Sequence, residues 1–554
     1  MAEKKSFHRK RRFYILSGSL LILLVAGFFF WRNYKYKLVN RQLDKLVTGK
    51  SKGLYQLDYK NLVINEALGN ISVENIEMIP DSQVYLSLYD QHQAPENLFY
   101  IRIPSLQITG VKTPRALLNK EISAHMIKIE NATIEVRMSK KNKETGTDSK
   151  KNISTEIYQQ LLGQLKSIRA DSVILENAIL TLMDKESKTV FCKAGGVSMQ
   201  FSGINIDSLG QNDSTQILFS KDIDIQCNQL EFPFKNRMYD LHVSGLDFNS
   251  QTGSFHTQQI RLKPRLSETA FARSFHFAKD RIDLSIGSLA ITNISREGIL
   301  HQQLLADNLQ MTGLSIRVFR DKSYPNDSVD RTHNYPSESV MLLPIPFHLK
   351  KILIKDSYIE YKEKNDKSDS SGKVTFSRVL AGIDNVTNMP EYIRRDNRMH
   401  VKFNAFFLNA SPFSADIEMK LNDRRGNFLM DAQLGEINAP ALNVLLRPMA
   451  LAELDKGKIN GLHYHLDATS MNAKGRLLLR YQDLSLKLLK KDDDKNKYKT
   501  RGIPSLAANL VMKNSNPQYG KTRWGEVDYK RDIHRSIFNL MWKSLFVAIK
   551  DVAM

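Results

Sequence analysis

The chain is poor in features that mark several common classes of protein. It has only two cysteines, Cys192 and Cys227, among 554 residues, which excludes a disulfide-stapled scaffold and a cysteine-rich zinc module. The two thiols could form one bridge in an oxidising compartment, or they could stay apart as buried side chains that behave like small hydrophobes. The sequence leaves both readings open.

Catalytic and metal-binding signatures are also lacking. The sequence contains no GxxxxGK[ST], GxSxG, HExxH or CxxC motif, so it gives no sign of a phosphate-binding loop, a serine nucleophile or a zinc site. His463 and His465 are two residues apart, as are Asp222 and Asp224, but such alternation is typical of the solvated face of a strand. We therefore expect no enzyme activity, no cofactor and no metal.

Long apolar runs are scarce, and the one that could cross a membrane lies near the N-terminus. Residues 13–31 carry no charge, and at 1.5 Å per residue they span about 28 Å, close to the hydrocarbon thickness of a bilayer. The basic stub at residues 1–12 places the N-terminus in the cytoplasm by the positive-inside rule. A cleavable signal peptide is the alternative, but no A-x-A-like site follows the run, which favours an uncleaved anchor. Either reading exports the rest of the chain.

Negative charge is in short supply as well. The chain has 59 acidic and 80 basic residues, a formal net charge of +21, so polyanions such as nucleic acid or anionic lipid headgroups would be attracted to it. A basic platform with interleaved aromatic residues, typical of nucleic-acid binders, is missing. Together with export, this argues against nucleic acid and in favour of a membrane partner.

What the sequence does contain is alternation of apolar and polar residues, the pattern of β-strands, from about residue 54 to residue 489. Helical spacing is confined to residues 156–168 and, more briefly, to 441–446. Polar loops are expected at 139–151, 321–339, 362–373 and 490–499. These observations predict a mostly β fold with a few short helices.

A ten-residue pattern recurs at residues 127–136, 173–182 and 352–361. Each copy has two apolar residues two apart, then Glu-Asn-Ala or a relative, then two more apolar residues of the opposite parity. Because a straight strand would point the two pairs at opposite faces, we predict a bulge or tight bend at Asn131, Asn177 and Asp356, residue types that tolerate a left-handed backbone. Repeated bent strands indicate an elongated, curved sheet. The candidate residues for its inner, apolar lining are Ile127, Ile129, Val173, Leu175, Ile352 and Ile354.

Residues 529–554 differ in character from the strands before them. On a helix, Ile533, Ile537, Leu540, Met541 and Leu545 would share one side, accompanied by several basic residues. This composition suits a helix that lies in a membrane interface; the alternative is a helix that caps the end of the sheet. The membrane-interface candidates are Arg531, Ile533, Arg535, Ile537, Trp542, Lys543, Leu545 and Phe546.

Three stretches give the chain a resemblance to a known family. The first is the apolar run followed by GLYQLDY at residues 53–59 and GNISVENIEM at 69–78. The second is LNVLLRP at 442–448, followed by KGKINGL and AKGRLLLRYQDL. The third is VMKNSNP at 511–517, GEV at 525–527 and the expected helix at 531–549. In these stretches the chain resembles the AsmA-like proteins of Gram-negative envelopes, especially those of Bacteroidota, whereas its middle, about residues 190–420, matches only in general character.

The resemblance implies a protein of the bacterial inner membrane with a single span and a periplasmic bulk. It implies relatedness to bridge-type lipid carriers, whose sheet folds into a U-shaped groove that is apolar inside. The implied parts are a cytoplasmic stub (1–12), a transmembrane helix (13–31), a β-groove region (32–525) and a C-terminal amphipathic helix (526–554).

The function implied by the resemblance is binding of phospholipid or another lipid in the groove, in support of phospholipid transport between membranes and outer-membrane biogenesis. The implied partners are the two membranes and envelope assembly proteins. The alternative is a structural or regulatory envelope protein that assists outer-membrane protein assembly without lipid transfer.

Overall fold

The structure is a computed structural model that describes residues 51–554 apart from 52, 66–67, 96, 112–120, 139–166, 208–215, 218, 235–237, 365–369, 493–496, 502–503 and 505–512. The chain forms two compact units: unit 1 runs to Gln258 and includes Arg296–His301, and unit 2 comprises Gln259–Ser295 and Gln302–Met554. The predicted anchor at 13–31 lies outside the described residues. Within them, no helix combines the length and apolarity needed to cross a bilayer.

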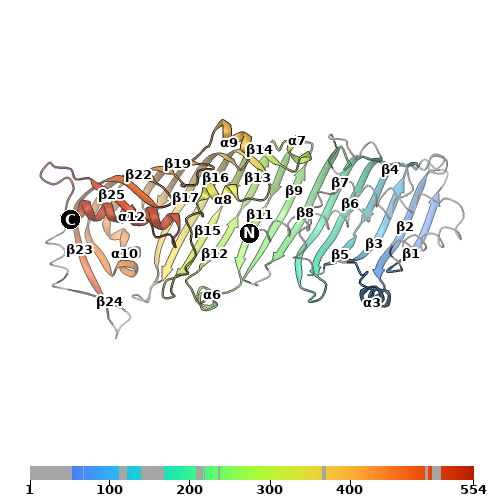
Figure 1. Ribbon diagram of the computed structural model, residues 1–554, viewed down its shortest axis with the longest axis horizontal. Coiled ribbons are helices and arrows are strands. Elements are labelled where there is room, and N and C mark those ends of the chain that lie inside the picture. The colour runs from blue at the N-terminus through green and yellow to red at the C-terminus, as the bar shows by residue number, and fades with distance from the viewer. Residues whose placement is uncertain are drawn as a thin grey trace. The chain divides into compact units, whose positions relative to one another are not determined.

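Unit 1 is a sheet in which almost every strand pairs with the next one along the chain (Figure 1). Its elements are β1 (Tyr55–Asn65), β2 (Asn70–Pro80), α3 (Ser82–Asp90), β3 (Asn97–Thr109), β4 (Glu121–Glu130), β5 (Thr133–Met138), β6 (Ser167–Asp184), β7 (Val190–Asp207), β8 (Asp222–Pro233), β9 (Tyr239–Asn249), β10 (Ser254–Thr257) and α7 (Arg296–Leu300). The helix predicted at 156–168 lies mostly outside the described residues, and its end is wrong because Ser167 already begins β6.

Unit 2 holds the remaining strands of the sheet, most of them antiparallel to their neighbours, and most of the helices. Its strands are β11 (Gln259–Pro264), β12 (Asp280–Ile286), β13 (Ser288–Thr292), β14 (Leu304–Thr312), β15 (Ser315–Asp321), β16 (Phe347–Lys364), β17 (Gly372–Thr387), β18 (Arg398–Phe407), β19 (Ser411–Lys420), β20 (Phe428–Leu434), β21 (Ile437–Asn438), β22 (Ala452–Ala468), β23 (Asn472–Asp492), β24 (Lys497–Thr500) and β25 (Gly525–Lys530). Its helices are α6 (Glu268–Arg273), α8 (Pro336–Met341), α9 (Pro390–Arg395), η2 (Ala439–Leu442), α10 (Asn443–Ala450) and α12 (Ile537–Ala553).

The bends predicted from the recurring pattern are confirmed. Asn131, Asn177 and Asp356 have φ angles of 54°, 51° and 48°, all in the left-handed region. The amide of Asn177 donates to the side-chain oxygen of Asn131 at 2.8 Å, so the bends of neighbouring strands are tied together. Each bend changes the parity of the strand, and apolar residues on both sides of it therefore reach the same face.

The recurring segments are paired with one another in each unit. In unit 1 the strand formed by β4 and β5 runs parallel to β6, with Ile127 opposite Val173 and Ile129 opposite Leu175. In unit 2 the strand formed by β14 and β15 runs parallel to β16 in the same way, with Leu309 opposite Ile352. Residues 309–318 are thus a fourth copy of the pattern, in which Gly313 provides the left-handed residue with a φ of 68°.

Two further expectations are corrected by the elements of unit 2. The polar loop expected at 490–499 is largely a hairpin, because β23 and β24 pair from Leu489 to Thr500. The short helix expected at 441–446 exists but continues to Ala450 with Pro448 inside it, and Leu451 ends it in the left-handed conformation. Pro448 lies in the sixth position of this helix, where it excludes one internal hydrogen bond without ending the helix.

Candidate functional site

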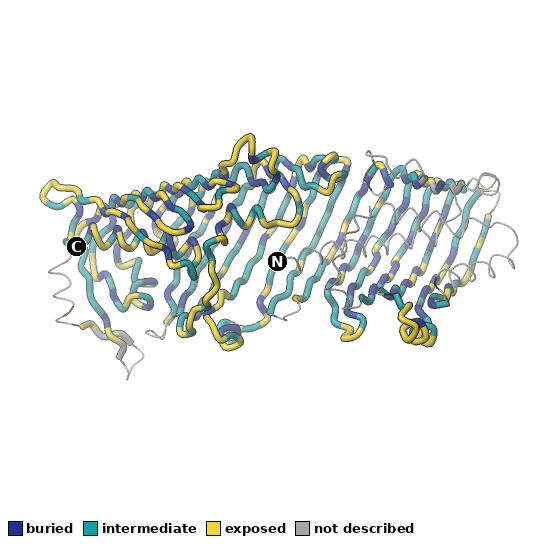
Figure 2. Tube along the Cα trace, in the orientation of Figure 1, coloured by how far each residue is buried: buried dark blue, intermediate teal, exposed yellow. Residues whose placement is uncertain are grey.

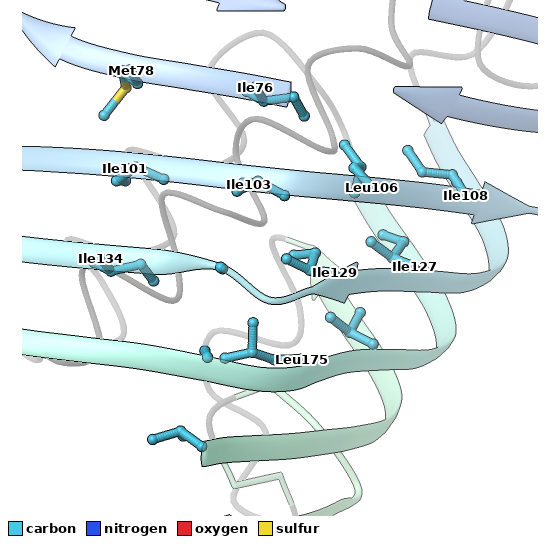
Figure 3. Close-up of a cluster of buried hydrophobic side chains, with 14 of the residues drawn as sticks. Ile76, Met78, Ile101, Ile103, Leu106, Ile108, Ile127, Ile129, Ile134 and Leu175 are labelled. Carbon is cyan, nitrogen blue, oxygen red and sulfur yellow. The ribbon is translucent and has the colours of Figure 1, made fainter. Parts of the chain in front are cut away.

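The apolar face of unit 1 is a sealed core at the positions that the sequence singled out. Ile127, Ile129, Val173 and Leu175 are only 3%, 1%, 4% and 6% exposed. All four belong to one cluster of buried side chains contributed by β1 to β8, and Figure 3 shows Ile127, Ile129 and Leu175 projecting to the same side of successive strands. At these residues the inner face is closed to solvent.

The corresponding face of unit 2 is only half-buried. Ile352 and Ile354 are of intermediate exposure, and Figure 2 shows long stretches of intermediate burial along the strands of this unit. Across the sheet, Ile354 is in register with Met311 on β14 and with Ala381 on β17. The six predicted lining residues therefore fall into two different environments, four buried and two partly accessible.

Four phenylalanines on β17, β18 and β19 form an aromatic cluster on the apolar face of unit 2. Phe376 is the centre: its ring centroid is 5.7, 5.6 and 5.2 Å from those of Phe403, Phe407 and Phe413. All four rings are half-buried, and Phe376 and Phe403 also pack against the small core around Ala381. We call these four residues the phenylalanine cluster; offset and edge-on rings of this kind offer a large apolar contact surface.

The phenylalanine cluster is not apparent from the sequence pattern. Each of its members occupies an inward position of an alternating strand, and this pattern is the same for a closed core. The signal that could have found it is aromatic density, since residues 403–413 hold four phenylalanines, of which only Phe406 has the opposite parity.

A segment of unit 2 crosses the apolar face from one edge of the sheet to the other. We call residues 322–346, which connect β15 to β16, the strap. It starts beside the end of β16, where the ammonium group of Lys322 lies 2.6 Å from the carboxylate of Glu363. At the opposite edge Tyr335, which is 1% exposed, packs on the ring of Phe428 at 6.0 Å and donates to the carbonyl of Thr469 at 2.8 Å. Since Phe428 points to the apolar face, the strap lies over that face.

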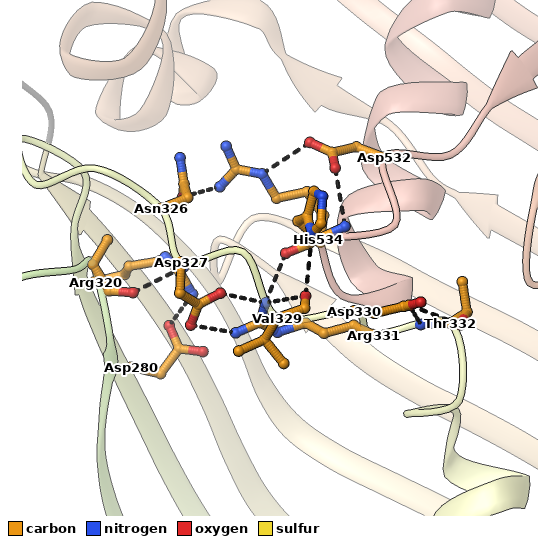
Figure 4. Close-up of polar contacts among 12 residues, drawn as sticks. Asp280, Arg320, Asn326, Asp327, Val329, Asp330, Arg331, Thr332, Asp532 and His534 are labelled. Atoms are coloured by element: carbon orange, nitrogen blue, oxygen red, sulfur yellow. Dashed lines mark hydrogen bonds and ion pairs between the residues drawn. The ribbon is translucent and has the colours of Figure 1, made fainter.

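The strap is fastened to the segment between β25 and α12 (Figure 4). The Arg331 guanidinium holds Asp327 in two hydrogen bonds of 2.6 and 2.8 Å and donates to the carbonyl of His534 at 2.9 Å. The hydrogen bonds from Arg331 also lower the pKa of the Asp327 carboxyl below its ordinary value. The strap is therefore fixed at its start, by Lys322, and at its middle, by Arg331 and Tyr335.

Helix α12 packs on the apolar face formed by β22, β23 and β25. Its buried residues are Ile537, Leu540, Ser544, Ala548 and Val552. Two of them are small, which allows the helix to approach the sheet closely, and the hydroxyls of Ser544 and Tyr464 lie 2.8 Å apart at the contact. Burial raises the pKa of the Tyr464 hydroxyl. In this respect α12 caps the sheet, as the alternative reading of the sequence expected.

The helix begins later than expected, and this changes the side that each candidate residue occupies. The expected helical segment at 526–554 contains the end of β25 and a turn, because α12 starts at Ile537 after Ser536. Of the expected stripe, Ile533 precedes the helix, whereas Ile537 and Leu540 are buried against the sheet and Met541 and Leu545 are half-buried.

Two of the basic interface candidates have structural contacts instead of open surface. Arg531 is 4% exposed and donates to the carbonyls of Ser470, Arg331 and Arg535 at 3.0, 2.8 and 2.7 Å. Arg535 is half-buried and contacts Asp532 at 3.3 Å as well as Asn326. Neither side chain is available to a membrane in this arrangement.

Most of the other interface candidates on the helix are exposed. Trp542 and Phe546 are 40% and 52% exposed, Lys543 is exposed and Leu545 is half-buried. Phe538, which is not among the predicted interface residues, is the most exposed aromatic residue of the helix at 72%.

The remaining chemical candidates have ordinary structural environments. Cys192 and Cys227 are buried and are not joined by a disulfide, and burial raises the pKa of Cys227. His465 lies 2.8 Å from the carboxylate of Asp431, and His463 lies 3.9 Å from it, on an exposed part of β22. The described ranges hold no group of three or more histidine, cysteine or acidic residues with the spacing of a metal site.

In comparisons with known proteins, no family model matches this chain and no curated protein matches it significantly.

Proposed function

We propose that this chain is a lipid-binding protein of the Gram-negative envelope, anchored in the inner membrane with its bulk in the periplasm. In this proposal the apolar face of unit 2 holds the acyl chains of a phospholipid or a related lipid. The protein would thereby support lipid transport between the membranes and outer-membrane biogenesis, without covalent chemistry.

The observation that carries the proposal is the half-buried phenylalanine cluster. Apolar area that water can reach costs about 25 cal/mol per Å² relative to its buried state, so four partly exposed rings on one face favour an apolar occupant. Aliphatic neighbours such as Ile354 and Ile359 extend the same contact surface. A flexible acyl chain can follow such a row of side chains from strand to strand.

A second candidate function is supported by unit 1. There the inner face is buried at Ile127, Ile129, Val173 and Leu175, as in a structural core. A rod with a filled interior would suit a structural or regulatory envelope protein that assists outer-membrane protein assembly. The two candidates differ in whether lipid contacts the face of unit 2 in cells.

Site-specific photocrosslinking distinguishes the two candidates. A benzophenone amino acid replaces Phe403, which belongs to the cluster, or Phe406, which has similar burial but points to the opposite face, with Arg378 over its ring at 5.0 Å. Cells that produce the full-length chain are labelled with radioactive phosphate and irradiated. We expect labelled phospholipid on the protein with the probe at residue 403 and little with the probe at residue 406.

Equal labelling at the two positions would indicate adventitious lipid, and no labelling at residue 403 would favour the structural candidate. Extraction of the lipid after crosslinking, followed by mass spectrometry, then identifies its headgroup.

A further inference from the structure

Helix α12 has two apolar sides, and only one of them is used for packing. The side made by Ile537, Leu540, Ser544, Ala548 and Val552 lies on the sheet. The second side consists of Phe538, Trp542 and Phe546, spaced four residues apart, with exposures of 72%, 40% and 52%. Residues at this spacing form one stripe along a helix, so three large rings stand side by side in contact with solvent.

The surroundings of this aromatic stripe are cationic. Lys543 and Lys550 are both exposed, and at 100° per residue they lie beside Phe546 at the edge of the stripe. The acidic residue of the helix, Asp551, has its carboxylate engaged by the backbone N–H of Glu526 at 2.9 Å. The surface thus combines aromatic rings with a positively charged margin.

We propose that the aromatic stripe of α12 docks on the surface of an anionic phospholipid bilayer while the opposite side of the helix stays on its sheet. Rings of Trp and Phe beside lysine are the composition of helices that lie at the headgroup boundary, about 5–10 Å into the interface. A helix fixed along a sheet cannot insert more deeply, so this depth also suits the geometry. The net charge of +21 adds a long-range attraction to an anionic membrane.

A protein partner fits the stripe less well than a bilayer does. A helix of 17 residues is about 25 Å long, and a stripe about 10 Å wide along it covers roughly a third of the 800 Å² that each partner buries in a stable protein interface. Two copies meeting through this surface would also bring their lysine margins together, which is unfavourable for like charges. An anionic bilayer has neither restriction.

The inference goes beyond the proposed function, because the stripe is a different surface from the phenylalanine cluster. Lipid could be absent from the apolar face of unit 2 while α12 still docks, and the reverse also holds. The crosslinking experiment and the experiment below therefore fail independently.

The test uses the tryptophans as local probes. The chain has three, Trp31, Trp524 and Trp542. A full-length variant with Trp31→Phe and Trp524→Phe keeps only Trp542, and is reconstituted into vesicles of ordinary lipid. A second population of vesicles, in which anionic phosphatidylglycerol carries brominated acyl chains that quench tryptophan on contact, is then added. Quenching can arise only from the added vesicles, so it reports docking on a second membrane.

We expect Trp542 to lose roughly half of its emission, as a ring in the interfacial region should, and the quenching to weaken with salt. The matched control keeps only Trp524, which is 44% exposed but lies under Arg476 at 5.2 Å on the other side of the sheet; it should be quenched little. Phe538→Ser with Phe546→Ser should reduce the quenching of Trp542 several-fold. Leu86→Ser with Tyr89→Ser, a pair on α3 that is 54% exposed at both positions, should leave it unchanged.

Several outcomes would overturn the proposal. Equal quenching of Trp542 and Trp524 would mean that the protein meets the vesicles without using the stripe. No quenching of Trp542 would mean that the stripe does not dock on the added bilayer. A blue shift that depends on protein concentration in the absence of added vesicles would mean that a second copy covers α12. Lys543→Glu with Lys550→Glu provides a further check, since both side chains are exposed and the variant should lose its preference for anionic over neutral vesicles.

Discussion

The contact between α12 and the sheet depends on a residue that has no side chain. Gly525 begins β25 directly beneath the helix. A Cβ atom at this position would lie 2.1 Å from the carbonyl oxygen of Ala548, 2.8 Å from the carbonyl carbon and 2.9 Å from a methyl group of Val552. The first two obstacles are backbone atoms, so no side-chain rotation can relieve them. Gly525→Ala should therefore displace the helix.

The size of the effect follows from this geometry. Carbon and oxygen atoms that are not bonded approach to about 3.3 Å, so the helix must move by roughly 1 Å. Overpacking of this kind costs about 1–3 kcal/mol, and the shift would also strain the contact between Tyr464 and Ser544. If the cost falls on the docking of α12 alone, the open form becomes about 5- to 150-fold more populated, since each 1.4 kcal/mol is a factor of ten.

Hydrogen exchange followed by mass spectrometry on the full-length chain measures this opening directly. Amides of residues 537–553 should exchange faster in Gly525→Ala by the stated factor, whereas amides of unit 1 should be unaffected. Gly382→Ala is the matched control, because a Cβ atom at this position of β17 meets nothing within 4 Å. Unchanged protection of α12 in Gly525→Ala would refute the close packing described above.

Three further predictions concern the apolar face and the strap. Ile129→Asp should prevent folding of unit 1, because an unpaired carboxylate in a sealed core costs several kcal/mol, whereas Ile354→Asp should fold and lose bound lipid. Urea unfolding measures the folding of each variant, and lipid analysis measures its bound lipid. Equal loss of folding in the two variants would mean that the face of unit 2 is sealed too. Arg531→Ala should destabilise the chain by about 2–4 kcal/mol, since it leaves buried carbonyls without donors; a shift within 0.5 kcal/mol in urea unfolding, about the size expected of a surface substitution, would contradict the buried role. Because the pKa of Asp327 is lowered in the folded chain, its carboxylate stabilises the fastened strap above the unfolded pKa of about 3.9, and this stabilisation is lost as the pH falls through the folded pKa. Hydrogen exchange of the strap measured at pH 3 to 5 should show this loss, whereas tryptic cleavage after Arg331 in samples returned from pH 3 should not. Asp327→Asn should abolish the pH dependence of the exchange.

The bends of the strands could be predicted from the sequence because they are a local property. Two apolar pairs of opposite parity cannot face one core without an extra residue between them, and Asn or Asp at the junction supplies the left-handed conformation at low cost. The fourth copy of the pattern, at residues 309–318, is not recognisable by residue type because Gly313 replaces the Asn or Asp. Glycine meets the same conformational requirement, so the pattern is better written by its φ angle than by residue type.

The orientation of α12 could not be predicted from the sequence, since it depends on tertiary packing. Ile537 and Leu540 of the predicted stripe are buried, but the sheet surface around Gly525 also accepts small residues, and Ser544 and Ala548 are both 0% exposed. The aromatic residues are then left outside. The prediction that Arg531 lies at a membrane interface fails for a related reason. Its carbonyl acceptors come from three separate segments, and a local sequence pattern does not predict contacts of that kind.

The difference between the two units explains why alternation alone cannot identify a binding face. Ile127 opposite Val173 and Leu309 opposite Ile352 occupy equivalent places in the same four-copy pattern, yet the first pair is sealed and the second is partly open. Sequence pattern and register are therefore matched at the two places while the burial of the side chains differs, so burial depends on tertiary packing that alternation does not encode. In unit 2 the strap and α12 are joined through Arg331 and the carbonyl of His534, so a change that loosens either segment should be felt by the other.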